Sequence, residues 1–71
     1  MPFVQVSMGT GRTPEQKRAL LDGISEVVHT TLGADYDSIR VWIVELEPDD
    51  VMLGQESLTE RRARTQRASI E

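Results

Sequence analysis

Large apolar and polar residues alternate at the start of the chain, over residues 3–8. A period of two is typical of a β-strand with one buried face, because successive side chains point to opposite faces of the sheet. Gly9, Thr10 and Gly11 then interrupt the alternation. The pattern therefore predicts a strand over residues 3–8, followed by a loop.

A helix start follows the loop. Thr13 offers a capping hydroxyl, Pro14 suits the first helical position, and Gln16 stands three residues after the cap. Apolar residues and one threonine then recur at helical spacing: Leu20, Leu21, Ile24, Val27, Val28, Thr31 and Leu32. Gly33 stands where a left-handed residue commonly ends a helix. The sequence predicts an amphipathic helix over residues 14–32.

A second strand is indicated over residues 38–46, which are rich in β-branched side chains. Two strands joined by one helix predict a parallel pair with a right-handed crossover. We expect Ile39, Val41 and Ile43 to lie under the helix, and Arg40, Trp42 and Val44 to face the other way. A short hairpin is expected over residues 51–55. The predicted fold class is α+β: a β-α-β subunit with a parallel strand pair and a C-terminal hairpin.

The chain has 71 residues, which predicts one domain over residues 1–58 and a basic, flexible tail over residues 59–71. The tail carries Arg61, Arg62, Arg64 and Arg67. A chain this short buries only about 60% of the surface that its unfolded form exposes. It contains no cysteine, so no disulfide can stabilise it. We therefore expect self-association, with a partner subunit covering Trp42.

The charge distribution argues against nucleic acid as a partner. Residues 1–60 carry four Lys and Arg against eleven Asp and Glu, a balance of −7, within a whole-chain net charge of −4. Such a body repels phosphates, and the basic tail has no aromatic residues for stacking on bases. No apolar run has the length of a membrane span, so we expect no membrane partner and a cytoplasmic location.

Pro2 is the first candidate for chemistry, because removal of Met1 would leave its nitrogen as a free secondary amine at the head of a strand. An α-amino group titrates near roughly 7.7–8.0, and burial or a nearby cation lowers that pKa. A neutral amine at pH 7 can act as a general base. The other interpretation of a Met-Pro start is a trimmed N-terminus without a catalytic role.

Two arginines are candidate anion binders. Arg12 lies in the loop before the helix cap, where a guanidinium can bind a carboxylate or form a surface salt bridge. Arg40 lies within the second strand, where a charge needs a ligand or an ion-pair partner in another subunit. His29 has no second metal ligand nearby and is expected to face solvent. The acidic residues Glu45, Glu47, Asp49, Asp50 and Glu56 suit a solvated rim.

Together these features resemble the short-chain 4-oxalocrotonate tautomerase family. The resemblance rests on Pro2, on the stretch Gly11-Arg12-Thr13-Pro14-Glu15-Gln16-Lys17, on the long helix, and on Ile39-Arg40-Val41, and it covers about residues 2–55. It implies a dimer with a four-stranded sheet backed by two helices, and three such dimers in a homohexamer.

The same resemblance implies a tautomerase activity without a metal or organic cofactor. The amino-terminal proline, here Pro2, would move a proton between carbon and oxygen of an unsaturated 2-keto or 2-hydroxy acid. Family arginines from neighbouring subunits bind the substrate carboxylates and polarise its oxygen, and these positions fall on Arg12 and Arg40. Val51 takes the position of a pocket-lining aromatic residue, which implies a wetter or larger pocket.

Three other functions stay open. Val51, and Gln55 in place of a hairpin glycine, are compatible with a non-catalytic scaffold that binds an anionic metabolite or a protein. Related dehalogenases of 3-haloacrylates use a glutamate to activate water, whereas the matching position here is Leu53. A nucleic acid contact would have to rest on the arginines of the tail.

Overall fold

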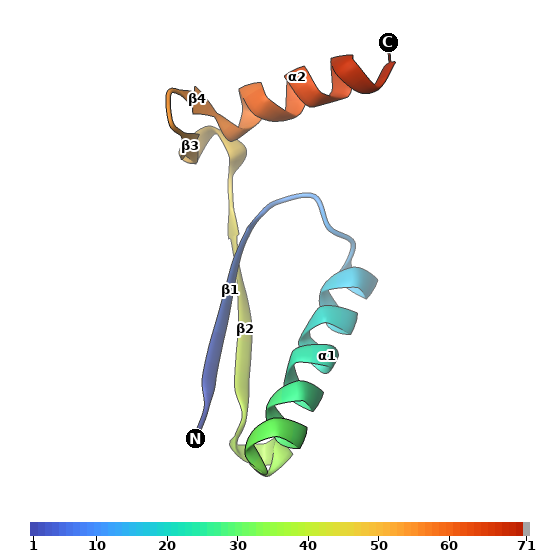
Figure 1. Cartoon of the computed structure of the whole chain (residues 1–71), viewed down its shortest axis with the longest axis vertical. Helices are drawn as coiled ribbons and strands as arrows, with labels where there is room; N and C mark the ends of the chain where they lie inside the picture. The colour runs from blue at the N-terminus through green and yellow to red at the C-terminus, as the bar shows by residue number, and fades with distance from the viewer. Residues whose placement is uncertain (71) are drawn as a thin grey trace.

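The computed structural model describes residues 1–70, and the side chains of residues 1–66. The elements follow the order β1 (Phe3–Gly9), α1 (Pro14–Leu32), the 3-10 turn η1 (Tyr36–Ser38), β2 (Arg40–Leu46), the 3-10 turn η2 (Pro48–Asp50), β3 (Met52–Leu53), β4 (Glu56–Ser57) and α2 (Leu58–Ile70). The molecule is elongated, with principal extents of 47 × 23 × 19 Å. Figure 1 shows β1, β2 and α1 as one layered unit, with the hairpin and α2 at its far end.

The strands β1 and β2 form a parallel pair, as the sequence predicts. Their register runs from Phe3 opposite Arg40 to Gly9 opposite Leu46. Because the strands are parallel, both begin at one end of the molecule and both finish at the other. This arrangement confirms the α+β, β-α-β fold class and decides which candidate residues meet.

Helix α1 has the predicted bounds and caps. The Thr13 side chain accepts a hydrogen bond from the Gln16 backbone, and the Gln16 side chain accepts one from the Thr13 backbone at 3.0 Å. Gly33 ends the helix in the left-handed conformation, with φ of 69°. These local interactions satisfy backbone groups that the helix itself leaves unpaired.

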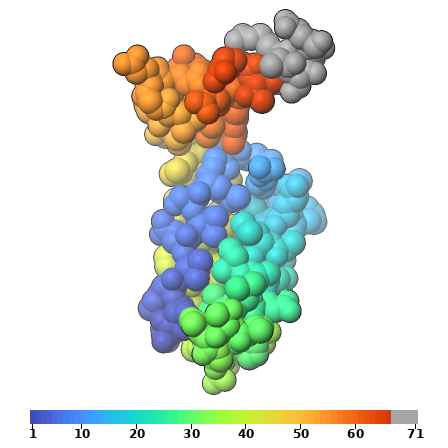
Figure 2. Space-filling view, viewed as in Figure 1, coloured from blue at the N-terminus to red at the C-terminus, as the bar shows by residue number. Residues whose placement is uncertain are grey.

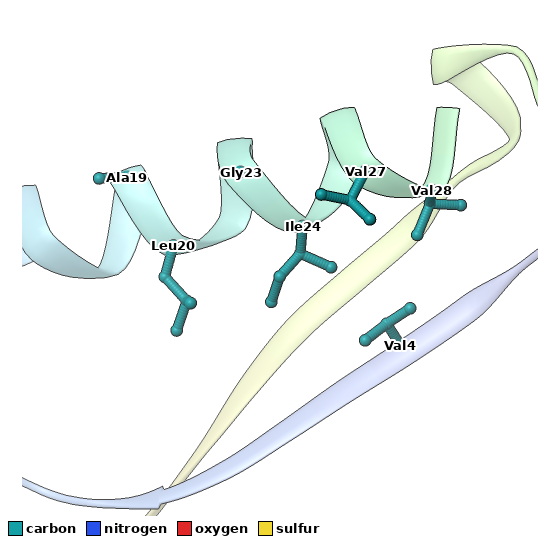
Figure 3. Close-up of a pocket in the computed structure, with 7 residues that line it drawn as sticks. All are labelled: Val4, Ala19, Leu20, Gly23, Ile24, Val27 and Val28. Atoms are coloured by element: carbon teal, nitrogen blue, oxygen red, sulfur yellow. The ribbon is translucent and has the colours of Figure 1, made fainter. Parts of the chain in front are cut away.

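The helix and the two strands enclose little buried surface. Of the described hydrophobic residues, Ile39 alone is buried, at 9% exposure. A groove between α1 and β1 is lined by Val4, Ala19, Leu20, Gly23, Ile24, Val27 and Val28. Leu20, Ile24 and Val28 point from α1 toward the strands, and Val4 points back toward the helix (Figure 3). The apolar face is therefore present but poorly covered within one chain.

The opposite face of the strand pair is also apolar and open. Trp42 is 40% exposed, contacts Phe3 edge to face at 6.4 Å between ring centroids, and donates its indole N–H to Gln5 at 3.1 Å. Phe3 is 65% exposed. The predicted strand faces are thus confirmed for Ile39 and Trp42. Exposed aromatic surface of this kind usually marks an interface.

Residues 52–57 form the expected hairpin, with β3 and β4 antiparallel and Gly54 at φ of 69°. Beyond the hairpin, α2 continues to residue 70, over residues that the sequence assigns to the tail at 59–71. Its start is a capping box: the Ser57 backbone N–H donates to Glu60 at 3.0 Å, and the Glu60 backbone N–H donates to Ser57 at 3.1 Å. Glu71 and the side chain of Arg67 lie outside the described residues, and the division at residue 58 stays a prediction.

No helix within residues 1–70 combines the length and the apolar character that crossing a bilayer requires.

Candidate functional site

Pro2 and Arg40 lie at the same end of the strand pair. The backbone N–H of Arg40 donates to the carbonyl oxygen of Pro2 at 3.0 Å. Pro2 is half-buried, and Phe3, the next residue, stands opposite Arg40 in the register. Parallel pairing therefore brings the candidate base and one candidate arginine together in a single chain.

The Arg40 side chain is exposed and folds back over η1. Its Nη1 donates to the carbonyl oxygens of Asp37 and Ile39, the second at 3.3 Å. Within the described residues, its Nε and Nη2 hydrogens make no hydrogen bond. A guanidinium has five donor hydrogens, so part of this group stays available to an anion.

Arg12 lies at the opposite end of the strand pair. It follows Gly11, whose φ of 122° requires a glycine, and it precedes the cap of α1. The seven residues of β1 separate Arg12 from Pro2, which at about 3.3 Å per residue is roughly 23 Å. The structure does not bring these two predicted site residues together within one chain.

Val51 lies at the same end of the strand pair as Arg12. It follows η2, is half-buried, and its carbonyl oxygen accepts a 2.8 Å hydrogen bond from the Leu58 backbone. The four predicted site residues therefore divide into two pairs. Pro2 and Arg40 occupy one end of the strand pair, and Arg12 and Val51 occupy the other, where Figure 1 shows the hairpin and α2.

Two clefts border Arg12. One is lined by Met8, Arg12, Gln16, Lys17 and Leu20, and the other by Thr10, Gly11, Arg12 and Arg62. In the first cleft the charge of Lys17 is paired with Glu45. Arg62 lines the second cleft, whereas the sequence predicts it in a solvated tail. The capping motif at Ser57 and Glu60 is the local signal of a helix start there.

Glu56 connects the hairpin to α2. Arg64 Nη2 donates to its carboxylate at 2.8 Å, and Arg61 Nε donates to the same oxygen. The hydrogen bond from Arg64, followed by that from Arg61, lowers the pKa of Glu56 from 4.5 to about 2. The same contact raises the pKa of Arg64. Two arginines of α2 thus form ion pairs with one carboxylate.

His29 is not the solvent-facing residue that the helical pattern predicts. Its ring is half-buried, its Nδ1 lies 2.7 Å from the Ala34 carbonyl oxygen, and it stacks on Tyr36 with centroids 4.1 Å apart. The turn after Gly33 brings Tyr36 over the end of the helix, which the pattern of α1 alone could not show. Across residues 1–70, no three His, Cys, Asp or Glu side chains converge as a metal site would need.

Comparison with known proteins identifies relatives along most of the chain. A family model described as "Tautomerase enzyme" matches residues 2–61. A 2-hydroxymuconate tautomerase from Bacillus subtilis is 40% identical over 60 residues, which cover 84% of this chain and 97% of the relative.

Solved structures show the same fold. A 4-oxalocrotonate tautomerase isozyme from Methylibium petroleiphilum superposes with a TM-score of 0.82 at 33% identity, covering 89% of this chain and 98% of that one. A heterohexamer 4-oxalocrotonate tautomerase from Chloroflexus aurantiacus gives a TM-score of 0.79 at 27% identity, covering 84% and 97%.

Proposed function

Because this chain belongs to the tautomerase family, we propose that it moves a proton between oxygen and carbon of an unsaturated 2-hydroxy or 2-keto acid, with Pro2 as general base. The observation that carries the proposal is the 3.0 Å hydrogen bond from the Arg40 backbone N–H to the Pro2 carbonyl oxygen, which supports placing both residues at one end of the strand pair. The relative from Bacillus subtilis is named for 2-hydroxymuconate, and we propose the same class of substrate here.

The base requires removal of Met1, because the Pro2 nitrogen in a peptide bond cannot accept a proton. An α-amino group titrates near roughly 7.7–8.0 in water, and a guanidinium close to it would disfavour its protonated form. The neutral amine then accepts the proton of the enol hydroxyl while the double bonds shift. The resulting ammonium returns that proton to a carbon atom, so the reaction balances without a cofactor.

Arg40 stabilises the charge that develops on the substrate oxygen. Its Nη1 binds Asp37 and Ile39, which leaves the Nε and Nη2 hydrogens to donate to an oxygen or a carboxylate. A fixed positive charge near a developing dienolate lowers the barrier more than it stabilises the substrate.

Arg12 can join this site only from another subunit, since about 23 Å of β1 separates it from Pro2 of its own chain. We propose that the chain forms a homohexamer, a trimer of dimers, in which Arg12 and Val51 of one subunit approach Pro2 of another. A homohexamer would bury apolar surface that is open in one chain, namely Phe3, Trp42 and the groove beside Val4, and this surface supports the proposal. The Chloroflexus aurantiacus relative is a heterohexamer.

The geometry favours proton transfer over hydration of 3-haloacrylates. Water activation needs a carboxylate that can accept a proton near neutral pH. Glu56 is occupied by Arg61 and Arg64, and its pKa of about 2 makes it a weak base. Leu53 offers no carboxylate.

The deciding experiment measures 2-hydroxymuconate ketonisation by ultraviolet absorbance. Protein with a mass-verified free Pro2 is compared with Pro2→Ala and with protein that retains Met1. We expect turnover in the first sample alone. Equal rates in all three samples would contradict a proline base and favour the non-catalytic scaffold.

A further inference from the structure

A cleft between α2 and the loop after β1 contains two guanidinium groups. Thr10, Gly11, Arg12 and Arg62 line it. Figure 2 shows the residues of α2 seated above the blue segment that follows β1. The family model matches residues 2–61, so Arg62 is the first residue beyond the matched region.

Glycines place the Arg62 side chain in this cleft. A Cβ atom added at Gly9 would lie 2.5 Å from Arg62 Nη2 and 2.9 Å from Leu58 Cδ2. Leu58 and Arg62 are four residues apart and therefore share one face of α2. A Cβ atom at Gly11 would lie 4.0 Å from Arg62 Nη1. The guanidinium thus lies against the backbone of the loop that carries Arg12.

Neither guanidinium in the cleft is neutralised. Across the described side chains, Arg12 and Arg62 form no ion pair and no hydrogen bond. By contrast, Glu56 binds Arg61 and Arg64 from the same helix. Two like charges in one cleft repel each other, and an anion between them removes that repulsion. A carboxylate suits both, because guanidinium groups bind its two oxygens in a planar geometry.

We propose that Arg62 acts with Arg12 to bind one carboxylate of the substrate, the carboxylate farther from the reacting oxygen. This proposal rests on the proposed function and deepens it: Arg62, which lies beyond the matched family region, sets how strongly the enzyme prefers unsaturated dicarboxylates to monocarboxylates. Residues 1–60 carry a net charge of −7, which repels a dianion. Arg12 and Arg62, which have no ion-pair partner among the described side chains, overcome this repulsion at the second carboxylate. Arg62 is therefore the residue that determines specificity.

The test compares two ligands with the same carbon skeleton. trans,trans-Muconate carries a carboxylate at both ends, and sorbate replaces one of them with a methyl group. Neither has a 2-hydroxyl group, so binding is measured by calorimetry without turnover. We expect the unmodified chain to bind muconate about tenfold more tightly than sorbate. In Arg62→Gln this preference should fall, because Arg12 alone then binds the second carboxylate, and sorbate affinity should stay unchanged.

Arg61→Gln is the matched control, because it removes the same charge from the same helix at a residue bound to Glu56. It should keep the preference for muconate. Arg62→Lys keeps the charge without the planar fork and should retain part of the preference, which guards against a folding defect in Arg62→Gln. Equal binding of muconate and sorbate by the unmodified chain, or unchanged muconate binding in Arg62→Gln, overturns the proposal.

The two proposals fail separately. A chain that binds muconate through Arg62 but does not ketonise 2-hydroxymuconate contradicts the proline base and supports the carboxylate cleft. A chain that ketonises 2-hydroxymuconate with equal affinity for muconate and sorbate contradicts the cleft alone.

Discussion

Gly9 lies directly beneath Arg62, so closely that a methyl group there would stand 2.5 Å from Nη2 of the guanidinium. The last residue of β1 thereby positions a side chain of α2. The same methyl group would stand 2.9 Å from the end of the Leu58 side chain. Both neighbours are flexible at that end, so they can move at modest cost, and Arg62 would leave the cleft beside Arg12.

Gly9→Ala should therefore weaken muconate binding while leaving sorbate binding unchanged. The backbone at Gly9 does not need a glycine conformation, since its φ is not positive, so the variant should fold. Calorimetry with the two ligands measures the effect, and circular dichroism checks the fold. Muconate binding as tight as in the unmodified chain would mean that Arg62 does not contact the ligand.

Arg40→Gln should lower kcat/KM for 2-hydroxymuconate about 100-fold, because one fixed donor to a developing oxyanion is worth that much or more. Arg18→Gln is the control: Arg18 is an exposed arginine paired with Asp22 on α1, away from Pro2. The kcat/KM of Arg18→Gln for 2-hydroxymuconate should stay unchanged. Similar losses in the two variants would point to a general effect of charge instead of a role for Arg40 in the site.

The attachment of the hairpin to α2 should weaken in acid. The pKa of Glu56 is about 2 in the folded chain against 4.5 for a free carboxyl, so its ionised form favours the fold. This contribution is complete above about 4.5 and is lost as the pH falls from there toward 2. Glu56→Gln should remove that part of the pH dependence, measured as the unfolding midpoint at several pH values.

Glu26→Gln is the control for this acid effect, since Glu26 is an exposed residue of α1 without an ion-pair partner among the described residues. It should retain the decline seen in the unmodified chain. A Glu56→Gln profile that follows the unmodified chain between pH 4.5 and 2 would contradict the role assigned to the Glu56 pairs.

Gly23→Ala should stabilise the chain by about 1 kcal/mol, because alanine favours a helix interior over glycine by that amount. A Cβ atom at Gly23 meets no atom within 4 Å in the single chain. Thermal unfolding measures the gain, and size-exclusion chromatography measures the assembly. A smaller oligomer in this variant would show that a partner backbone approaches Gly23 closely.

Local patterns in the sequence were enough to predict most of the fold. Thr13, Pro14, Gln16 and Gly33 define the ends of α1 through contacts within a few residues, and the structure reproduces them. The alternation over residues 3–8 and the β-branched run predicted two strands, which a single connecting helix makes parallel. The capping pair Ser57 and Glu60 is equally local and indicates a helix start, although the arginines that follow it are typical of a solvated tail.

The sequence by itself determined the helix caps, the strand pattern and the candidates Pro2, Arg12 and Arg40, because these depend on neighbours along the chain. The tertiary structure decided which of them meet. Parallel pairing joins Pro2 to Arg40 through one backbone hydrogen bond and leaves Arg12 at the far end of β1. Packing of α2 on Gly9 brings Arg62 to Arg12. Such contacts depend on the path of the whole backbone, which no spacing of residues along the chain encodes.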